Sequence, residues 1–385
     1  MAGVSGAQDY EAAGLLEGLG GEALAQRIEL LDQLSADGFA LEELVQAASD
    51  GRLTLLPVER ALAGEPAYSQ REISELSGVP VETLDRQRRA LGLIVGDPDE
   101  RTLSADDLQA AKRVRVFLDA GVDPEAIVET ARVMAMSMSQ LVAANRELLG
   151  PLLAADGADE LELAQRFKGL AATLTPQIGP TLEYIYKHQL HDQFRDLVLG
   201  ADLAEGDEAV DEMAVAFADL VGYTRLGERL PPEELGRLTG RLAELATDAA
   251  GGSVRLIKLI GDAAMFASPD VEALVSSSLD LSAAAAEQGE GFPAVRVGIA
   301  TGPVLSRGGD LYGGTVNLAS RITDVAYPGS VLVSAPVRDA VGDAFAFSDA
   351  GPKRLKGIKR PVHVFRCRRH GERERDAAAQ RGVSE

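Results

Sequence analysis

Apolar residues recur every three or four positions through the first half of the chain, which predicts helices that each bury one face. One such run is Leu24, Ile28, Leu31 and Leu34. Ser69 precedes Gln70-Arg71-Glu72 and is a candidate N-cap. The stretch 140–198 predicts two or three longer helices. Residues 1–200 are therefore expected to be almost entirely helical.

The pattern changes at Met213, where short apolar runs begin to alternate with helical stretches. The β-rich runs are MAVAFADLV, VRLIKLIGDAAMFAS, VRVGIATGPVLS, SVLVS and PVHVFRC. The second run predicts two strands that turn at Gly261-Asp262, and the third a strand pair broken at Gly302-Pro303. Helices are expected over 232–249, over 271–287 and from Thr315. This mixture predicts an α+β sandwich.

Length and composition narrow the class of protein. A chain of 385 residues is long enough for two or three domains. It has no apolar run long enough for a transmembrane helix, and its start lacks the basic residues of a signal peptide, so a cytoplasmic protein is expected. One cysteine, Cys367, excludes internal disulfides and argues against a zinc site. The net charge of −22 disfavours binding to nucleic acid or to an anionic membrane.

Two carboxylates follow apolar runs in the second half. Asp219 ends the run VAFAD, and Asp262 lies at the predicted hairpin turn. If the two strands are neighbours, both carboxylates meet at one end of the sheet, where they repel unless a cation lies between them. A hard divalent ion such as Mg²⁺ would satisfy both. The alternative is that each is a separate, solvated aspartate at a strand end or turn.

Other charged and polar residues stand close to these two in the sequence. Lys258 interrupts the apolar run LIKLIGDAAMF, and a charge buried there needs a partner or a ligand. In GGDLYGGTVNLASRIT, Asp310 precedes a glycine-rich turn, and Asn317 and Arg321 share one face of the following helix. Arginine suits phosphate oxygens. The alternative is an ordinary turn followed by a solvated helix face.

Three blocks, FADLVGYT, KLIGDAAMF and DLYGGTVNLASR, resemble the catalytic domain of the class III nucleotide cyclases in order and spacing. The resemblance covers about 212–368 and implies a ferredoxin-like α+β fold. It implies a role for each matching residue: Asp219 and Asp262 bind metal, Lys258 and Asp310 select the base, Asn317 orients the ribose, and Arg321 stabilises the transition state. The late segment KRLKGIKRPVHVF offers Lys356 or Lys359 for the triphosphate.

The resemblance also implies two Mg²⁺ or Mn²⁺ ions in each active site and a site formed between two domains. In this family the metal aspartates come from one partner and the other four residues from its mate. This chain carries both sets but one such domain. A head-to-tail homodimer with two equivalent sites is therefore expected.

The chemistry of the bases favours ATP as the substrate. Adenine presents a donor at N6 and an acceptor at N1, which suit Asp310 and Lys258, whereas guanine reverses this pattern. The expected reaction is attack of the ribose 3′-hydroxyl on the α-phosphorus of ATP, which gives cyclic AMP and pyrophosphate. A guanylate cyclase is the nearest enzymatic alternative.

The stretches YSQREISELSGVPVETLDRQRRALGLI and LSADDLQAAKRVRVFLDAGVDPEAI lie within residues 68–128. Together they resemble the helix-turn-helix region of MerR-type regulators. Gly78 would make the turn, and a small core is expected from Ile73, Leu76, Val79 and Leu84. Either Arg86, Arg88 and Arg89 contact DNA, or the fold serves as a regulatory or dimerising module. The segment GDPDERTLSADDL is acidic, whereas DNA-contacting segments are basic, so the regulatory role is favoured. A DNA-binding regulator with a degenerate cyclase domain is the alternative.

The expected organisation is a helical regulatory region over 1–200, a linker over 201–211, a cyclase domain over 212–368 and a disordered tail over 369–385. His188 and His191 lie three residues apart, near the end of the last helix before the linker. Histidine changes its charge between about pH 5 and 8, so this pair could make the linker sensitive to pH. The alternative is two solvated surface histidines.

Overall fold

The computed structural model of the chain describes residues 6–153, 160–199, 210–289 and 291–371. The chain divides into two compact units, Met1–Leu203 and Ala204–Glu385, and each is described by itself. Most of the expected linker and most of the expected tail lie outside the described residues. None of the described helices is both long and apolar enough to cross a membrane.

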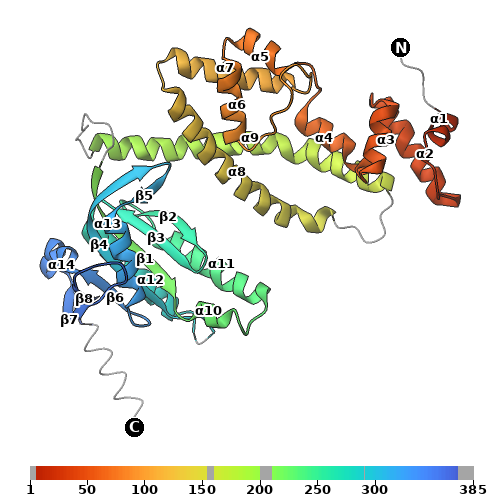
Figure 1. Cartoon of the computed structure of the whole chain (residues 1–385). Helices are drawn as coiled ribbons and strands as arrows, with labels where there is room; N and C mark the ends of the chain where they lie inside the picture. The colour runs from red at the N-terminus through yellow and green to blue at the C-terminus, as the bar shows by residue number, and fades with distance from the viewer. Residues whose placement is uncertain (1–5, 154–159, 200–209, 290, 372–385) are drawn as a thin grey trace. The chain divides into compact units, whose positions relative to one another are not determined.

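The first unit is helical, as its periodicity predicts (Figure 1). Its helices are α1 Ala7–Ala12, α2 Gly21–Ala36, α3 Leu41–Ser49, the 3-10 helix η1 Leu53–Leu55, α4 Leu56–Ala63, α5 Gln70–Ser77, α6 Val81–Ala90, α7 Ala105–Asp119, α8 Pro124–Leu153 and α9 Glu160–Leu199. The two longest, α8 and α9, cover the stretch where two or three longer helices are expected. Separate hydrophobic cores form within α1–α4 with the start of α9, and around α5–α7.

Helices α5 and α6 are joined by the short connection 78–80. The Ser69 hydroxyl accepts a hydrogen bond from the Glu72 N–H, which confirms the predicted N-cap. Gly78 ends α5 at φ +71°, a conformation that glycine adopts without strain. Of the predicted core, Ile73, Val79 and Leu84 are buried. The prediction for Leu76 is wrong, because it lies on the outer face of α5 and is 56% exposed.

The second unit is an α+β domain with one mixed sheet, as predicted. Its elements are β1 Val210–Leu220, α10 Tyr223–Leu226, α11 Pro232–Ala249, β2 Arg255–Ile260, β3 Ala263–Ser268, α12 Val271–Ala286, β4 Val295–Arg307, β5 Asp310–Tyr312, α13 Gly314–Asp324, β6 Val331–Ser334, α14 Ala335–Val341, the 3-10 helix η2 Gly342–Ala344, β7 Ala346–Lys353 and β8 Val362–Arg368. The strand order is β2-β3-β1-β4-β6-β8-β7, and β5 pairs with β4. The β4–β6 pair is parallel and the others are antiparallel.

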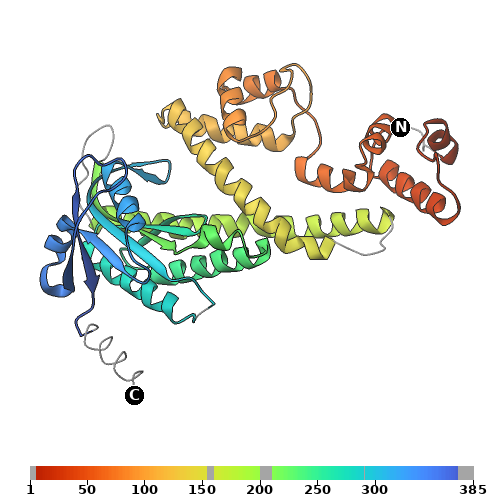
Figure 2. The ribbon, with the colours of Figure 1, turned by 60° about the horizontal axis from the view of Figure 1, so that its bottom comes forward.

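Helices cover both faces of this sheet (Figure 2). Side chains of α11, α12 and α14 pack on one face with the alternating small residues of β1. Helix α13 packs on the other face against Val215 of β1 and Met265 of β3. The candidate site residues all belong to this domain, and α13 carries two of them.

Strand β4 corrects one prediction. The run VRVGIATGPVLS forms a single strand, not a pair broken at Gly302-Pro303. Gly302 has φ +150° and keeps its place opposite Met213 of β1, so the ladder continues past the glycine. An added Cβ at Gly302 would lie 2.9 Å from the Thr315 hydroxyl, so the glycine allows α13 to approach the strand. The turn occurs instead at Gly308-Gly309, before β5.

The ends of the domain also differ from the expected boundaries. Strand β1 begins at Val210, inside the segment expected to be a linker. Arg369, the first residue of the expected tail, donates to the Asp280 carboxylate at 2.6 Å. Among the described residues, the contacts of the domain therefore extend beyond β8.

Candidate active site

The two candidate metal aspartates meet at one end of the sheet. Strand β1 pairs with β3 so that Asp219 lies opposite Ala263, the residue after Asp262. The N–H of Leu220 donates to the Asp262 carbonyl at 3.1 Å, which holds the hairpin turn against the end of β1. The turn itself uses Gly261 at φ +60°. The strand pairing thus brings together the carboxylates that the sequence singles out.

Asp219 is largely buried, with 19% of its side chain exposed. Its carboxylate accepts a hydrogen bond from Arg296 Nε at 2.8 Å. Burial raises the pKa of Asp219 above its usual range; the Arg296 bond opposes this shift, and the nearby charges of Asp262 and Asp324 add to it. The carboxylate therefore occupies a place where additional positive charge would be favourable.

Arg296 is a site residue that the sequence reasoning missed. It lies on β4 directly opposite Asp219, between the buried residues Val295 and Val297. Its Nη1 also donates to the Asp324 carbonyl at 3.1 Å. The signal was present in the sequence, because a charge inside an apolar strand is the same feature that drew attention to Lys258.

The residues fit a hard divalent cation. Asp219 and Asp262 supply carboxylate oxygens, the ligands that Mg²⁺ and Mn²⁺ prefer. Among the residues that the structure describes, no group of three or more His, Cys, Asp or Glu side chains could hold a metal. Two carboxylates alone are a partial ligand set, of the kind that Mg²⁺ completes with water and substrate phosphates.

Lys258 and Asp310 form an ion pair, although 52 positions separate them. Lys258 lies on β2 opposite Met265 of β3, and Asp310 begins β5. The Leu311 N–H donates to the other carboxylate oxygen of Asp310 at 2.8 Å, which fixes its orientation. The lysine is 38% exposed and the aspartate 24%, so both remain accessible to a ligand. The pair presents a cationic donor beside an anionic acceptor.

Asn317 and Arg321 lie on α13, which packs closely against strand β4. An added Cβ at Gly298 of β4 would lie 2.2 Å from the Thr323 nitrogen, so only glycine allows α13 to pack this tightly. Asn317 is exposed. Arg321 Nη1 donates to the Asp324 carboxylate at 2.9 Å. The structure thus places both residues on one helix, with Arg321 paired to the last residue of that helix.

Lys356 and Lys359 lie in the loop between β7 and β8, and both are exposed. The structure does not bring them into contact with the other candidates, and the choice between them stays open.

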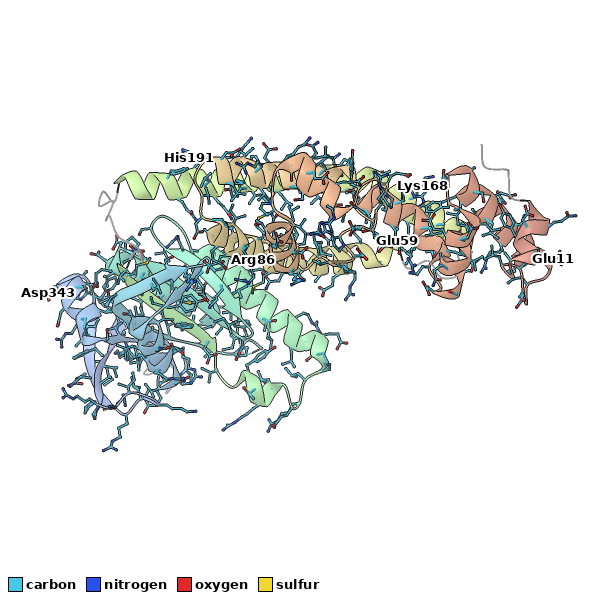
Figure 3. The ribbon with its side chains drawn as sticks, turned by 45° about the horizontal axis from the view of Figure 1, so that its top comes forward. Glu11, Glu59, Arg86, Lys168, His191 and Asp343 are labelled. Carbon is cyan, nitrogen blue, oxygen red and sulfur yellow. The ribbon has the colours of Figure 1, made fainter. Side chains whose placement is uncertain are left out.

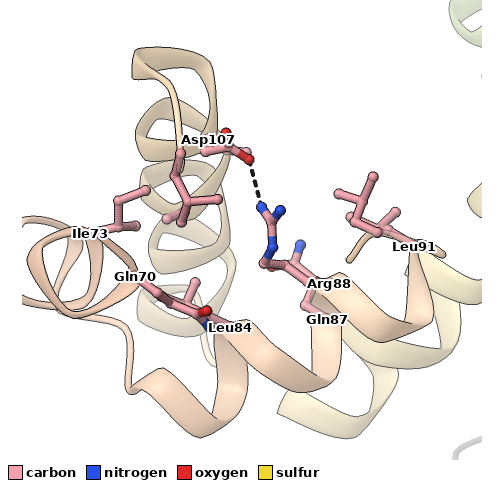
Figure 4. Close-up of a pocket in the computed structure, with 11 residues that line it drawn as sticks. Gln70, Ile73, Leu84, Gln87, Arg88, Leu91 and Asp107 are labelled. Atoms are coloured by element: carbon pink, nitrogen blue, oxygen red, sulfur yellow. Dashed lines mark hydrogen bonds and ion pairs between the residues drawn. The ribbon is translucent and has the colours of Figure 1, made fainter. Parts of the chain in front are cut away.

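The arginines that would contact DNA under the alternative interpretation are paired with acidic residues. In α6, Arg86, which is labelled in Figure 3, pairs with Glu125, and Arg88 pairs with Asp107 at 2.6 Å. The Arg88–Asp107 pair lines a small cavity of about 50 Å³ between α5, α6 and α7, together with apolar residues such as Leu84 and Leu91 (Figure 4). The positive charge of this surface is therefore largely compensated within the chain.

Comparisons with known proteins cover both units. A family model for the adenylate and guanylate cyclase catalytic domain matches residues 206–367, and one for the adenylate cyclase regulatory domain matches residues 8–194. A pH-sensitive adenylate cyclase of Mycobacterium tuberculosis is 40% identical over 378 residues, which cover 95% of this chain and 94% of that protein. An adenylate cyclase of Streptomyces coelicolor is 32% identical over 278 residues, 71% of each chain. The crystal structure of the adenylyl cyclase CyaB from P. aeruginosa aligns with 42% of this chain and 96% of its own, at 24% identity and a TM-score of 0.37.

Proposed function

The chain belongs to the class III adenylate cyclases, and on that premise we propose that two copies of it form two active sites that convert ATP to 3′,5′-cyclic AMP and pyrophosphate. The chain is an adenylate cyclase with a regulatory domain before its catalytic domain. In the reaction, the ribose 3′-hydroxyl attacks the α-phosphorus, a new P–O bond closes the ring, and the bond to pyrophosphate breaks.

Asp219 and Asp262 are proposed to hold the divalent metal. Their adjacency at the end of β1 and the raised pKa of Asp219 support this assignment. When bound, Mg²⁺ or Mn²⁺ would lower the pKa of the attacking hydroxyl and neutralise charge on the phosphate oxygens. Arg296 donates to Asp219, and a guanidinium has further donors that suit phosphate oxygens.

The remaining residues bind and orient the nucleotide. Asp310 is proposed to accept from the adenine amino group, and Lys258 to donate to the ring nitrogen. Their ion pair, with both side chains partly exposed, is the observation that favours ATP over GTP. Asn317 would hold the ribose. Arg321 would stabilise the charge that develops on the α-phosphate, as positioned cations do in phosphoryl transfer.

A head-to-tail homodimer is proposed, in which Asp219 and Asp262 of one subunit face the other residues of its partner. The edge of the sheet supports this. Strand β2 is an edge strand, and Leu259 and Ile260, next to Lys258, are 46% and 47% exposed. Natural sheets protect apolar edges of this kind, and a second copy would cover this one.

The N-terminal unit is proposed to act on the catalytic domain and not on DNA. The ion pairs of Arg86 and Arg88 support this, because compensated arginines contribute little to binding phosphate. One relative is pH-sensitive. We therefore propose that His188 and His191, both exposed on α9, contribute to a response to pH.

The test is cyclic nucleotide formation by the purified full-length chain, given ATP or GTP with Mg²⁺ or Mn²⁺. Cyclic AMP from ATP, much less cyclic GMP from GTP, and loss of both in Asp262→Asn would support the proposal. A Glu244→Gln variant, which changes an exposed carboxylate on α11, serves as the control. Cyclic AMP formation that persists in Asp262→Asn would contradict the metal assignment.

A further inference from the structure

Asp324, the last residue of α13, accepts hydrogen bonds from two arginines of the candidate site, Arg296 and Arg321. Its backbone carbonyl accepts from Arg296 Nη1 at 3.1 Å, and its carboxylate accepts from Arg321 Nη1 at 2.9 Å. Arg296 also donates from Nε to the Asp219 carboxylate at 2.8 Å, so one arginine joins the end of α13 to a candidate metal aspartate. The side chain of Asp324 is 51% exposed and that of Arg321 is 40% exposed, so both can meet a second molecule.

Helix stability does not explain an aspartate at this position. The C-terminal end of a helix carries partial negative charge, and an acidic residue there is unfavourable. The exposed ion pair between Arg321 and Asp324 contributes little to the free energy of unfolding. The contacts of Asp324 with Arg296 and with Arg321 explain its position better.

The two contacts of Asp324 belong to different active sites if the sites are shared between subunits. Arg296 and Asp219 then serve the site whose metal this chain holds. Arg321 serves the site whose metal the partner holds. A guanidinium has five N–H donors, and Asp324 accepts from one nitrogen of Arg321. The other donors can therefore face a phosphate while Asp324 keeps the arginine in place.

We propose that Asp324 is a positioning residue shared by the two active sites: it orients Arg321 for one site and adds negative charge beside the metal aspartates of the other. This rests on the proposed function, and in particular on the composite site. The role is indirect, because the residue acts through Arg321 in one site and through the electrostatic field in the other.

The first test is Asp324→Asn in the full-length chain, which keeps the backbone carbonyl and the side-chain size but removes the charge. Binding of Mn²⁺ without nucleotide, followed by electron paramagnetic resonance, is expected to weaken by about fivefold, because a nearby negative charge is lost. The kcat for ATP at saturating Mn²⁺ is expected to fall about two- to fivefold, the worth of an exposed ion pair. Glu244→Gln breaks the comparable exposed pair with Arg241 on α11 and is expected to change neither value.

The second test separates the two effects in mixed dimers of an Asp219→Asn chain with an Arg321→Ala chain. Such a dimer has one complete site, which takes its metal aspartates from the second chain and its arginine from the first. Adding Asp324→Asn to the first chain is expected to lower kcat alone, and adding it to the second to raise the Mn²⁺ requirement alone.

Wild-type values for Asp324→Asn in both readouts, or equal changes in Glu244→Gln, would overturn the proposal. Identical effects from either chain of the mixed dimer would overturn it as well. An inactive parent mixture, without Asp324→Asn, would instead contradict the composite site itself. The two failures are therefore distinguishable.

Discussion

The Lys258–Asp310 pair makes a quantitative prediction about the choice of base. The double change Lys258→Gln with Asp310→Asn replaces a charged donor and a charged acceptor by two amides; asparagine matches the shape of aspartate, and glutamine is one atom shorter than lysine. Amides can donate or accept, so the altered pair can serve the pairing edge of either purine. The preference for ATP over GTP is therefore expected to shrink, although the site keeps its geometry.

The size of the effect follows from the exposure and bonding of the pair. Charge-assisted hydrogen bonds are about twice as strong as neutral ones, so each contact to adenine should lose roughly 0.7–1 kcal/mol. Together the two losses lower kcat/KM for ATP by about 10- to 30-fold. GTP gains at least about tenfold, because its O6 and N1–H no longer face unpaired groups. Their ratio should fall by about a hundredfold.

The assay measures kcat/KM for both nucleotides with the full-length chain. Because Lys258 is 38% exposed, the pair contributes at most about 1 kcal/mol to folding, and the variant should unfold within a few degrees of the wild type. Arg241→Gln with Glu244→Gln removes a comparable exposed pair on α11 and is the control. A folded double variant with the wild-type ratio of ATP to GTP would refute the base-selecting role.

Three further predictions concern the metal site, the packing of α13 and the response to pH. Because burial raises the pKa of Asp219, Mn²⁺ affinity should fall as the pH drops through that raised pKa, and Asp219→Asn should lack the affinity at every pH in a Mn²⁺ titration. The same shift has the opposite effect on folding. The stability that Asp219 contributes is fully present at low pH and is lost as the pH rises through the raised pKa. Urea unfolding of the wild type and of Asp219→Asn, both without metal and over a range of pH, would detect this difference. Gly298→Ala should destabilise the domain by about 1–3 kcal/mol and abolish cyclase activity, because the new Cβ meets Thr323 of α13; a fully active, equally stable variant would refute this packing argument. His188→Gln with His191→Gln should flatten the activity–pH profile, and an unchanged profile would end the histidine hypothesis.

Much of the fold could be predicted because its signals are local. The periodicity of two in VAFADLV and the turn at Gly261-Asp262 are enough to predict a strand and a hairpin, and both are found. Strand β4 was wrongly divided because a Gly-Pro step usually ends a strand. Its continuity depends on pairing with β1 along its whole length, which no local pattern encodes.

The candidate site, too, was predictable only where its signals are local in the sequence. Asp219 and Asp262 were singled out as charges next to apolar runs, and strand pairing brings them together. The contacts of Arg296 and Asp324 depend on the strand register and on how closely α13 packs, so only the structure brings them to the site. Leu76 was misplaced for a related reason, because helical spacing alone does not tell which apolar residue of a short helix faces the core.

The composite active site is tested most directly by mixing two inactive chains. Full-length Asp219→Asn and Arg321→Ala chains are each expected to make no cyclic AMP. Mixed under conditions that allow subunits to exchange, they should form dimers with one intact site and recover up to about a quarter of the wild-type activity, since half of the dimers are mixed and each has one of two sites. Recovery of cyclic AMP formation on mixing is the result that the shared site predicts. A mixture that stays inactive although its subunits exchange would contradict it.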